Sequence, residues 1–245
     1  MMEYYAESNK GCLRELNEDN YCCGSSHGGT SFYFAVADGL GGHNAGEAAS
    51  RIAVDLFAER LPFVETTEIK TAGKCITEII EKANRRILNA ADEEKSLSGM
   101  GTTAVIGVVD KDNVLTVGNA GDSRAYLLSE NGFTKLTTDH TYVEYLVGCG
   151  MLKREEAANH PDRSMLTKAL GIDEVVEPDI FTFELKSGDR LLFCSDGLYV
   201  MLGDEIIKEK LENKSADVES ICRELVRLAI EAGGHDNVTV IVAEI

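Results

Sequence analysis

The sequence has few prolines and no long apolar stretch. Only three prolines occur in 245 residues, and no tract rich in proline and serine marks an internal linker, so we expect a single domain over 1–245. No apolar run approaches the ~20 residues that a membrane-spanning helix needs, and the opening MMEYYAESNKGC has no apolar centre like that of a signal peptide. These absences predict a cytoplasmic protein without a membrane segment.

Basic residues are also scarce. The chain has 24 lysines and arginines against 42 acidic residues, which gives a formal net charge of −18. Nucleic acids and anionic membranes bind positive surface, so this balance argues against both as partners. Such acidity usually serves solubility. The alternative is that some of the carboxylates gather around cations.

Several catalytic and metal-binding signatures are missing. The seven cysteines contain no CxxC pair and no zinc spacing, which predicts reduced, mostly buried thiols. No GxxxxGK[ST] sequence occurs, so a P-loop is excluded, and Asn44 stands where the third glycine of GxGxxG belongs. No serine lies in GxSxG and no cysteine neighbours a histidine. Nothing therefore signals a covalent nucleophile.

Apolar periodicity separates helical from strand-like segments. Helices are expected over 44–60, 66–94, 203–212 and 216–232. Strands are expected over 31–37, in TTAVIGVV, VLTVGNA, RAYLLS and FTKLT, in IFTFEL and RLLFCS, and in the final NVTVIVAEI. We expect the four middle segments to form an antiparallel meander, IFTFEL and RLLFCS to form a hairpin across KSGD, and 139–170 to be irregular and helical. Long helices beside such strands indicate an α+β sandwich.

Four aspartates lie where these strands begin or end. Asp38 in FAVADG, Asp122 in VGNAGDS and Asp196 in LLFCSDG follow apolar strands, and Asp236 precedes the last strand. Asp-Gly after a strand is ordinary turn chemistry, but strand ends in an antiparallel sheet can share one rim. Four carboxylates on one rim repel each other unless cations neutralise them. Oxygen ligands without histidine or cysteine suit Mg²⁺ or Mn²⁺.

The residues around Asp38 extend this hypothesis. The glycines after it let backbone approach an ion, and the Gly39 carbonyl is itself a candidate ligand. Asp38 is then a candidate bridge between two metals about 3.5–4 Å apart, a geometry for in-line attack of water on phosphorus. Upstream, LRELNED offers the Arg14 guanidinium for phosphate oxygens, with Glu18 and Asp19 close behind. Each of these three alone is an ordinary surface residue.

Eight motifs, in order, resemble the metal-dependent protein phosphatases of the PP2C (PPM) family, in its bacterial branch. They are LRELNEDN, VADGLGGHNAGE, GMGTTAV, VGNAGDSRAYLL, LTTDHT, GMLKREEAANHPDRSMLTKALG, LLFCSDGL and GGHDNVTVIV. Each is weak alone, but the ordered set is specific and covers almost the whole chain. The resemblance implies a four-layer α-β-β-α sandwich of two antiparallel sheets flanked by helices, and a flap segment at about 141–164.

The resemblance also implies roles for the site residues. Asp38 would bridge two ions, Mn²⁺ or Mg²⁺, and Arg14 would bind phosphate. The other implied ligands are the Gly39 carbonyl, Asp196 and Asp236 at the first ion, Glu18 and Asp19 at the second, and Asp122 with Asp196 at a weaker third site.

The implied activity is hydrolysis of phosphoserine and phosphothreonine in proteins by direct attack of a water that bridges the two ions. A Hanks-type Ser/Thr kinase and its substrates are the implied partners, and a monomer is expected. Leu40 occupies the place of a histidine proposed as general acid in eukaryotic relatives, so the proton donor stays open between a metal-bound water and His43. Two alternatives also stay open: a catalytically weak binding member of this fold, and a two-metal hydrolase of small molecules or nucleic acid.

Overall fold

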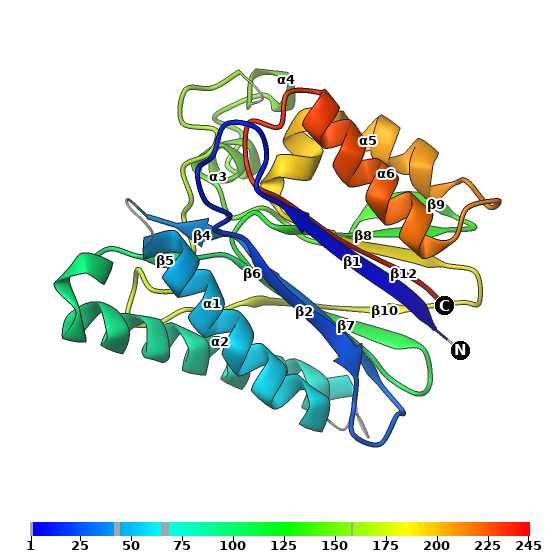
Figure 1. Ribbon diagram of the computed structural model, residues 1–245, viewed down its shortest axis with the longest axis horizontal. Coiled ribbons are helices and arrows are strands. Elements are labelled where there is room, and N and C mark those ends of the chain that lie inside the picture. The colour runs from blue at the N-terminus through cyan, green and yellow to red at the C-terminus, as the bar shows by residue number, and fades with distance from the viewer. Residues whose placement is uncertain (1, 42–44, 65–68, 158) are drawn as a thin grey trace.

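The computed structural model describes residues 2–41, 45–64, 69–157 and 159–245. Two five-stranded antiparallel sheets face each other, with one helix pair outside each (Figure 1). The first sheet has the order β1 (Glu3–Asn9), β12 (Val238–Glu244), β11 (Arg190–Cys194), β8 (Arg124–Ser129), β9 (Gly132–Lys135). The second has the order β10 (Asp179–Glu184), β7 (Val114–Ala120), β6 (Ala104–Val109), β3 (Phe32–Ala37), β2 (Asn20–Ser25).

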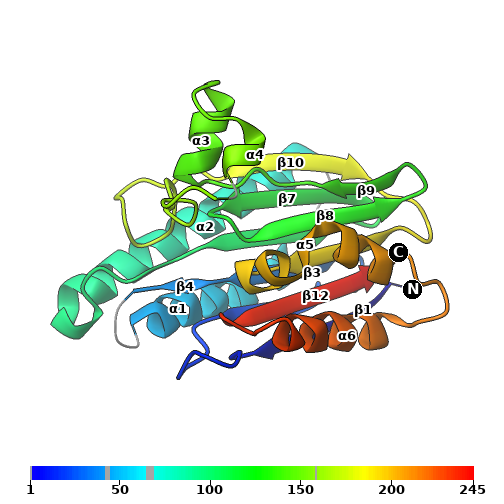
Figure 2. The same ribbon diagram turned by 90° about the horizontal axis from the view of Figure 1, so that it is seen from above.

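The helices cover the outer faces of the sheets. They are α1 (Ala45–Arg60) and α2 (Ile69–Glu93) on the second sheet, and α5 (Asp196–Leu211) and α6 (Val218–Glu231) on the first. Two short helices, α3 (Tyr142–Gly148) and α4 (Arg154–Ala157), lie together to one side of the strands (Figure 2). The remaining elements are the strand pair β4 (Gly39–Leu40) and β5 (Gly101–Thr102), and the 3₁₀ turns Leu61–Phe63 and Lys95–Leu97.

Three apolar layers hold the sandwich together. Between the sheets, Phe34 of the second sheet stacks on Phe193 of the first, with ring centroids 5.5 Å apart. Outside the sheets, α1 and α2 bury one apolar layer and α5 and α6 another. Central strands are covered on both faces, so β6 is buried throughout and its sequence AVIGVV is continuously apolar. The predicted α+β four-layer sandwich is confirmed.

The predicted hairpin between IFTFEL and RLLFCS is wrong. β10 pairs with β7 in the second sheet, whereas β11 lies between β8 and β12 in the first. β10 is an edge strand and exposes alternate residues, whereas β11 is buried along its whole length. The KSGD connection therefore crosses from one sheet to the other. The predicted meander divides in the same way, because β6 pairs with β7 and β8 pairs with β9 in different sheets.

Over the described residues the other predicted elements agree with the structure, with one shifted start; position 44 and positions 66–68, where the first two predicted helices begin, lie outside those residues. The 203–212 helix begins earlier, at Asp196, and the backbone breaks at Gly203, whose φ of 70° and ψ of 162° are not helical. All seven cysteines are free as predicted, but only Cys194 and Cys222 are buried, so the prediction of mostly buried thiols is wrong. Within the described residues, no helix combines the length and the apolarity needed to cross a bilayer.

Candidate metal centre

Both sheets contribute to the predicted carboxylate rim. Asp38 follows β3 of the second sheet, and Asp122 lies where the chain crosses from β7 to β8. Asp196 follows β11 of the first sheet, and Asp236 precedes β12. Burial raises the pKa of Asp38 well above its usual value, and the nearby charges of Asp19, Asp196, Asp122 and Asp236 raise it further. The four aspartates predicted from strand ends therefore lie together, at an edge that the two sheets share.

The backbone of Asp38 is fixed by Thr102 of β5 and by Thr103, which directly follows β5. Its N–H donates to Thr103 Oγ1 at 2.9 Å, and its carbonyl accepts from Thr102 Oγ1 and from the Thr103 N–H, each at 2.9 Å. None of these bonds uses the Asp38 carboxylate. These bonds therefore hold the main chain of Asp38 in place independently of what its side chain binds.

Close packing at Gly39 brings Glu18 to the site. The Gly39 N–H donates to the Glu18 carbonyl at 3.2 Å, and a Cβ on Gly39 would lie 2.3 Å from the Gly46 carbonyl oxygen. A Cβ on Gly46 would in turn lie 2.6 Å from Glu18 Oε1. Both glycines are needed, because only a residue without a side chain fits at either position.

Asp19 is the most deeply buried carboxylate of the group, with 5% of its surface exposed. Its Oδ2 accepts from Ser195 Oγ at 2.6 Å and from Thr239 Oγ1 at 2.7 Å, both in the first sheet region. Its Oδ1 is buried without a partner. Burial raises the pKa of Asp19 to about 7, helped by the charges of Asp196 and Asp236. A buried carboxylate oxygen without a donor is a place where a cation fits.

Arg14 already binds one of the predicted ligands. Its Nη2 donates to Asp236 Oδ2 at 2.7 Å, while about half of the Arg14 side chain stays exposed. Asn237 anchors the loop that carries Arg14: its Nδ2 donates to the Lys10 and Leu16 carbonyls, and its Oδ1 accepts from the Glu18 N–H at 2.8 Å. These bonds join residues more than 200 positions apart, so no local sequence pattern marks the anchoring role.

Asp122 is held by a network that the sequence analysis missed. The Tyr199 hydroxyl donates to the Asp122 carbonyl at 3.1 Å. The Arg124 guanidinium lies over the Tyr199 ring, 3.4 Å from its centroid, and forms a forked ion pair with Asp139. Burial raises the pKa of Asp122 to about 7, and the charges of Asp196 and Asp139 add to this shift. Tyr199 is 77 positions from Asp122 in the chain, so no local pattern marks this contact.

The donor set fits hard divalent cations. Every candidate side chain offers oxygen. Burial raises the pKa values of Asp19, Asp38 and Asp196, and the charges of neighbouring carboxylates raise them further, a repulsion that a cation would relieve. The candidate side chains are neighbours but do not form a closed ligand shell. In the described part of the chain, no three acidic, histidine or cysteine side chains have the arrangement of a formed metal centre.

His43, the proton-donor candidate from the sequence, lies outside the described residues. His160 has local contacts: its Nδ1 accepts from the Asp162 N–H at 3.1 Å, and its ring meets Tyr142 edge-on. Leu40 lies in β4, opposite Gly101 of β5.

The raised pKa values predict how metal-free stability varies with pH. Asp19 and Asp122 have pKa values of about 7 and Asp196 of about 6, against 3.8 for an ordinary aspartate. The folded state therefore binds these protons more tightly than the unfolded state does. The stabilisation of the folded state by this proton binding is complete below about pH 4 and is lost as the pH rises to about 7. Divalent ions offset the charge repulsion that remains, so we expect Mn²⁺ to raise the melting temperature more at about pH 8 than at about pH 5.5.

Thermal unfolding followed by fluorescence, with EDTA or Mn²⁺ at both pH values, measures this difference. Asp112→Asn removes an exposed carboxylate far from any of these pKa shifts and should behave like the unaltered protein. An equal Mn²⁺ effect at the two pH values would contradict the expectation.

Known proteins share both the sequence and the fold. A family model described as "Protein phosphatase 2C" matches residues 14–238. Serine/threonine phosphatase stp of Listeria welshimeri is 37% identical over 240 residues, which cover 97% of this chain and 93% of that protein. The crystal structure of Stp1 from Staphylococcus aureus has a TM-score of 0.93 and 34% identity, over 100% of this chain and 95% of the other.

A further solved structure carries metal. The catalytic domain of the phosphatase PstP, in complex with two manganese ions, has a TM-score of 0.87 and 34% identity over 99% of this chain and 97% of that one. The family is metal-dependent. Since the family model spans most of the sequence and the relatives span nearly all of it, the prediction from the eight motifs is confirmed, and this chain belongs to the protein phosphatase 2C family.

Proposed function

We propose that this protein is a metal-dependent phosphatase that removes phosphate from phosphoserine and phosphothreonine in proteins. The observation that carries the proposal is the gathering of carboxylates from both sheets around Asp38, beside an arginine, in a member of a phosphatase family. Relatives over nearly the full chain are named serine/threonine phosphatases. Proteins phosphorylated by a Hanks-type kinase are the substrates and partners that this family suggests.

The carboxylates would hold the cofactor. We assign Asp38 to a bridging position between two Mn²⁺ or Mg²⁺ ions, and Asp122 with Asp196 to a weaker third site. The other proposed ligands are the Gly39 carbonyl, Asp196, Asp236, Glu18 and Asp19. Ions held there would activate water for direct attack on phosphorus and neutralise charge on the phosphoryl oxygens.

We propose that Arg14 binds the phosphate itself. Its guanidinium is half exposed beside Asp236, so nitrogens remain free to donate to phosphoryl oxygens. Residues 141–164 leave and rejoin the body at one place, where the Tyr142 N–H donates to the Met165 carbonyl and Thr141 pairs with Leu166. We interpret this segment as a flap of one phosphatase domain spanning 1–245, and the protein as a monomer.

Replacing Arg14 by alanine should mainly raise KM. The guanidinium binds phosphate in both the ground state and the transition state, so its loss weakens both by a similar amount. A hydrogen bond to a charged group contributes about 1.5–3 kcal/mol, which corresponds to a fall of about 10- to 100-fold in kcat/KM. Steady-state kinetics on a phosphoserine peptide measures it, with Arg85→Ala, an exposed arginine on α2, as the matched control. A large fall in kcat at unchanged KM would assign Arg14 another role.

The proposed function is tested by phosphate release from phosphoserine and phosphothreonine peptides. After EDTA treatment and dialysis, we expect no turnover without added metal, and rapid turnover with Mn²⁺ or Mg²⁺. Hydrolysis of small phosphate esters with none of the phosphopeptides would favour a small-molecule phosphatase instead. No hydrolysis of either substrate class with any divalent ion would favour a binding protein of this fold.

A further inference from the structure

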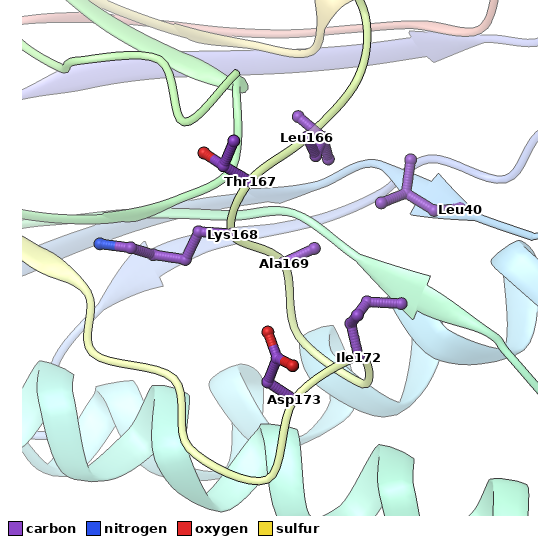
Figure 3. Close-up of a pocket in the computed structure, with 7 residues that line it drawn as sticks. All are labelled: Leu40, Leu166, Thr167, Lys168, Ala169, Ile172 and Asp173. Carbon is purple, nitrogen blue, oxygen red and sulfur yellow. The ribbon is translucent and has the colours of Figure 1, made fainter. Parts of the chain in front are cut away.

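A cavity of about 270 Å³ opens beside the proposed metal centre. Leu40 lies on one side of it and the segment 166–173 on the other (Figure 3). Leu40, Leu166 and Ile172 lie around Ala169, whereas the Lys168 ammonium extends away from Leu40 (Figure 3). Ile172 is 55% exposed, so an apolar surface faces solvent here.

The cavity and Asp38 are held by the same small set of backbone bonds. Leu40 of β4 pairs with Gly101 of β5, and on the other side of β5 Thr102 exchanges two backbone hydrogen bonds with Leu170, at 3.0 and 2.8 Å. The Thr102 hydroxyl also donates to the Asp38 carbonyl. These bonds therefore connect the cavity wall directly to the backbone of Asp38.

The outer wall of the cavity is preorganised by a buried amide. Asn84 of α2 is 1% exposed; its Oδ1 accepts from the Gly171 N–H at 2.6 Å and its Nδ2 donates to the Asp173 carbonyl at 2.8 Å. These bonds fix the backbone on either side of Ile172. Ordering the wall in advance reduces the entropy that binding must overcome.

The lining favours an aliphatic group. Most of the lining side chains are apolar, and the Lys168 ammonium is already paired with Asp179 Oδ1 at 2.8 Å. The charge left at the cavity is the exposed Asp173 carboxylate, which repels acidic groups. The volume lies below the roughly 300–1,000 Å³ of pockets that hold a whole small molecule. It suits one side chain of a larger substrate.

The position relative to Asp38 sets which side chain of the substrate this is. Leu40 is two residues from Asp38, so the cavity wall lies within two residue lengths of that proposed metal ligand. An extended substrate peptide advances about 3.3–3.6 Å per residue, so it covers the same distance in about two residues. We propose that the cavity is a specificity subsite for one aliphatic side chain of the phosphoprotein, within about two positions of the phosphorylated residue. This inference rests on the proposed function and adds a sequence preference to it.

The test is a panel of phosphoserine peptides that differ only in one leucine, placed in turn at each of the two positions before and after the phosphoserine. A hydrophobic contact of this kind changes kcat/KM by about 10-fold or more. We expect one position to show that gain over serine, mostly through KM, and aspartate at the same position to be disfavoured. p-Nitrophenyl phosphate, which has no neighbouring side chain, reports the activity of the centre alone.

Ile172→Asp should remove the leucine preference while leaving hydrolysis of p-nitrophenyl phosphate within about 2-fold. Val175→Asp is the matched control, because Val175 is 73% exposed in the same segment and does not line the cavity; it should keep the preference. Ile172→Ser repeats the test without a new charge. Equal kcat/KM across the panel, or a preference that survives both Ile172 variants, overturns the subsite alone. No hydrolysis of any phosphopeptide overturns the proposed function and the subsite with it.

Discussion

Asp38→Asn is expected to lower phosphopeptide hydrolysis by about three orders of magnitude or more while the protein stays folded. Charge stabilisation by bound metal ions supplies several kcal/mol to such reactions, and about 4 kcal/mol corresponds to a 1,000-fold change in rate. The amide is nearly isosteric with the carboxylate but is a much weaker metal ligand. The main-chain bonds of Asp38 to Thr102 and Thr103 do not involve its side chain, so they should persist.

Stability provides the second readout for this variant. Asp38 lies among carboxylates that raise its pKa, so removing its charge should leave the melting temperature in EDTA equal or higher. The gain in melting temperature on adding Mn²⁺ should shrink. Asp112→Asn, the same change in an exposed turn, controls for the substitution itself. Turnover near that of the unaltered protein, in a folded Asp38→Asn variant, would rule out Asp38 as the bridging ligand.

Asp236→Asn is expected to reduce kcat/KM by about 100- to 1,000-fold, or about 3–4 kcal/mol. Asp236 combines two roles, since it is a proposed ligand and the ion-pair partner of Arg14 at 2.7 Å. If it acted only by orienting Arg14, Asp236→Asn would cost no more than Arg14→Ala. A ligand role predicts a larger loss and a higher Mn²⁺ concentration for half-maximal activity.

A double-mutant cycle separates these two roles. Arg14→Ala alone should leave the Mn²⁺ requirement nearly unchanged, and the double variant should require as much Mn²⁺ as Asp236→Asn alone. Residues in direct contact generally have non-additive effects. The loss of catalytic activity in the double variant should therefore be smaller, as a free energy, than the sum of the losses in the two single variants. A Mn²⁺ requirement that follows Arg14 and ignores Asp236 would contradict the ligand assignment.

The strand-end pattern in the sequence predicted that Asp38, Asp122, Asp196 and Asp236 lie together, and the structure confirms this. Asp38, Asp196 and Asp236 each adjoin an apolar strand, and that position alone places them at a sheet edge. What the pattern could not supply was the sheet to which each strand belongs. A short polar turn such as KSGD serves a hairpin and a crossing between sheets equally well, because both need only a reversal of chain direction.

The pattern of apolar and polar residues within each strand indicates part of what was missing, namely whether the strand lies at the edge or in the middle of its sheet. IFTFEL alternates apolar and polar residues, as an edge strand does, whereas RLLFCS is continuously buried in the middle of its sheet. No such sequence pattern predicts the Arg124–Tyr199 contact or the hydrogen bonds from Asn84 to the cavity wall. They join residues 75 or more positions apart, and each partner alone has the composition of an ordinary strand, helix or loop.

The antiparallel pairing of β1 with β12 has a practical consequence for handling this protein. Asn9 pairs with Val238 near Asp236, whereas Glu3 pairs with Glu244 at the other end of the same strands. Six residue steps separate these pairs, or roughly 20 Å, and Figure 1 shows the start of β1 and the end of β12 lying side by side there. An affinity tag, a fluorophore or a surface linker attached at either end would project away from the carboxylates, so the immobilised enzyme should keep its catalytic face open to large protein substrates.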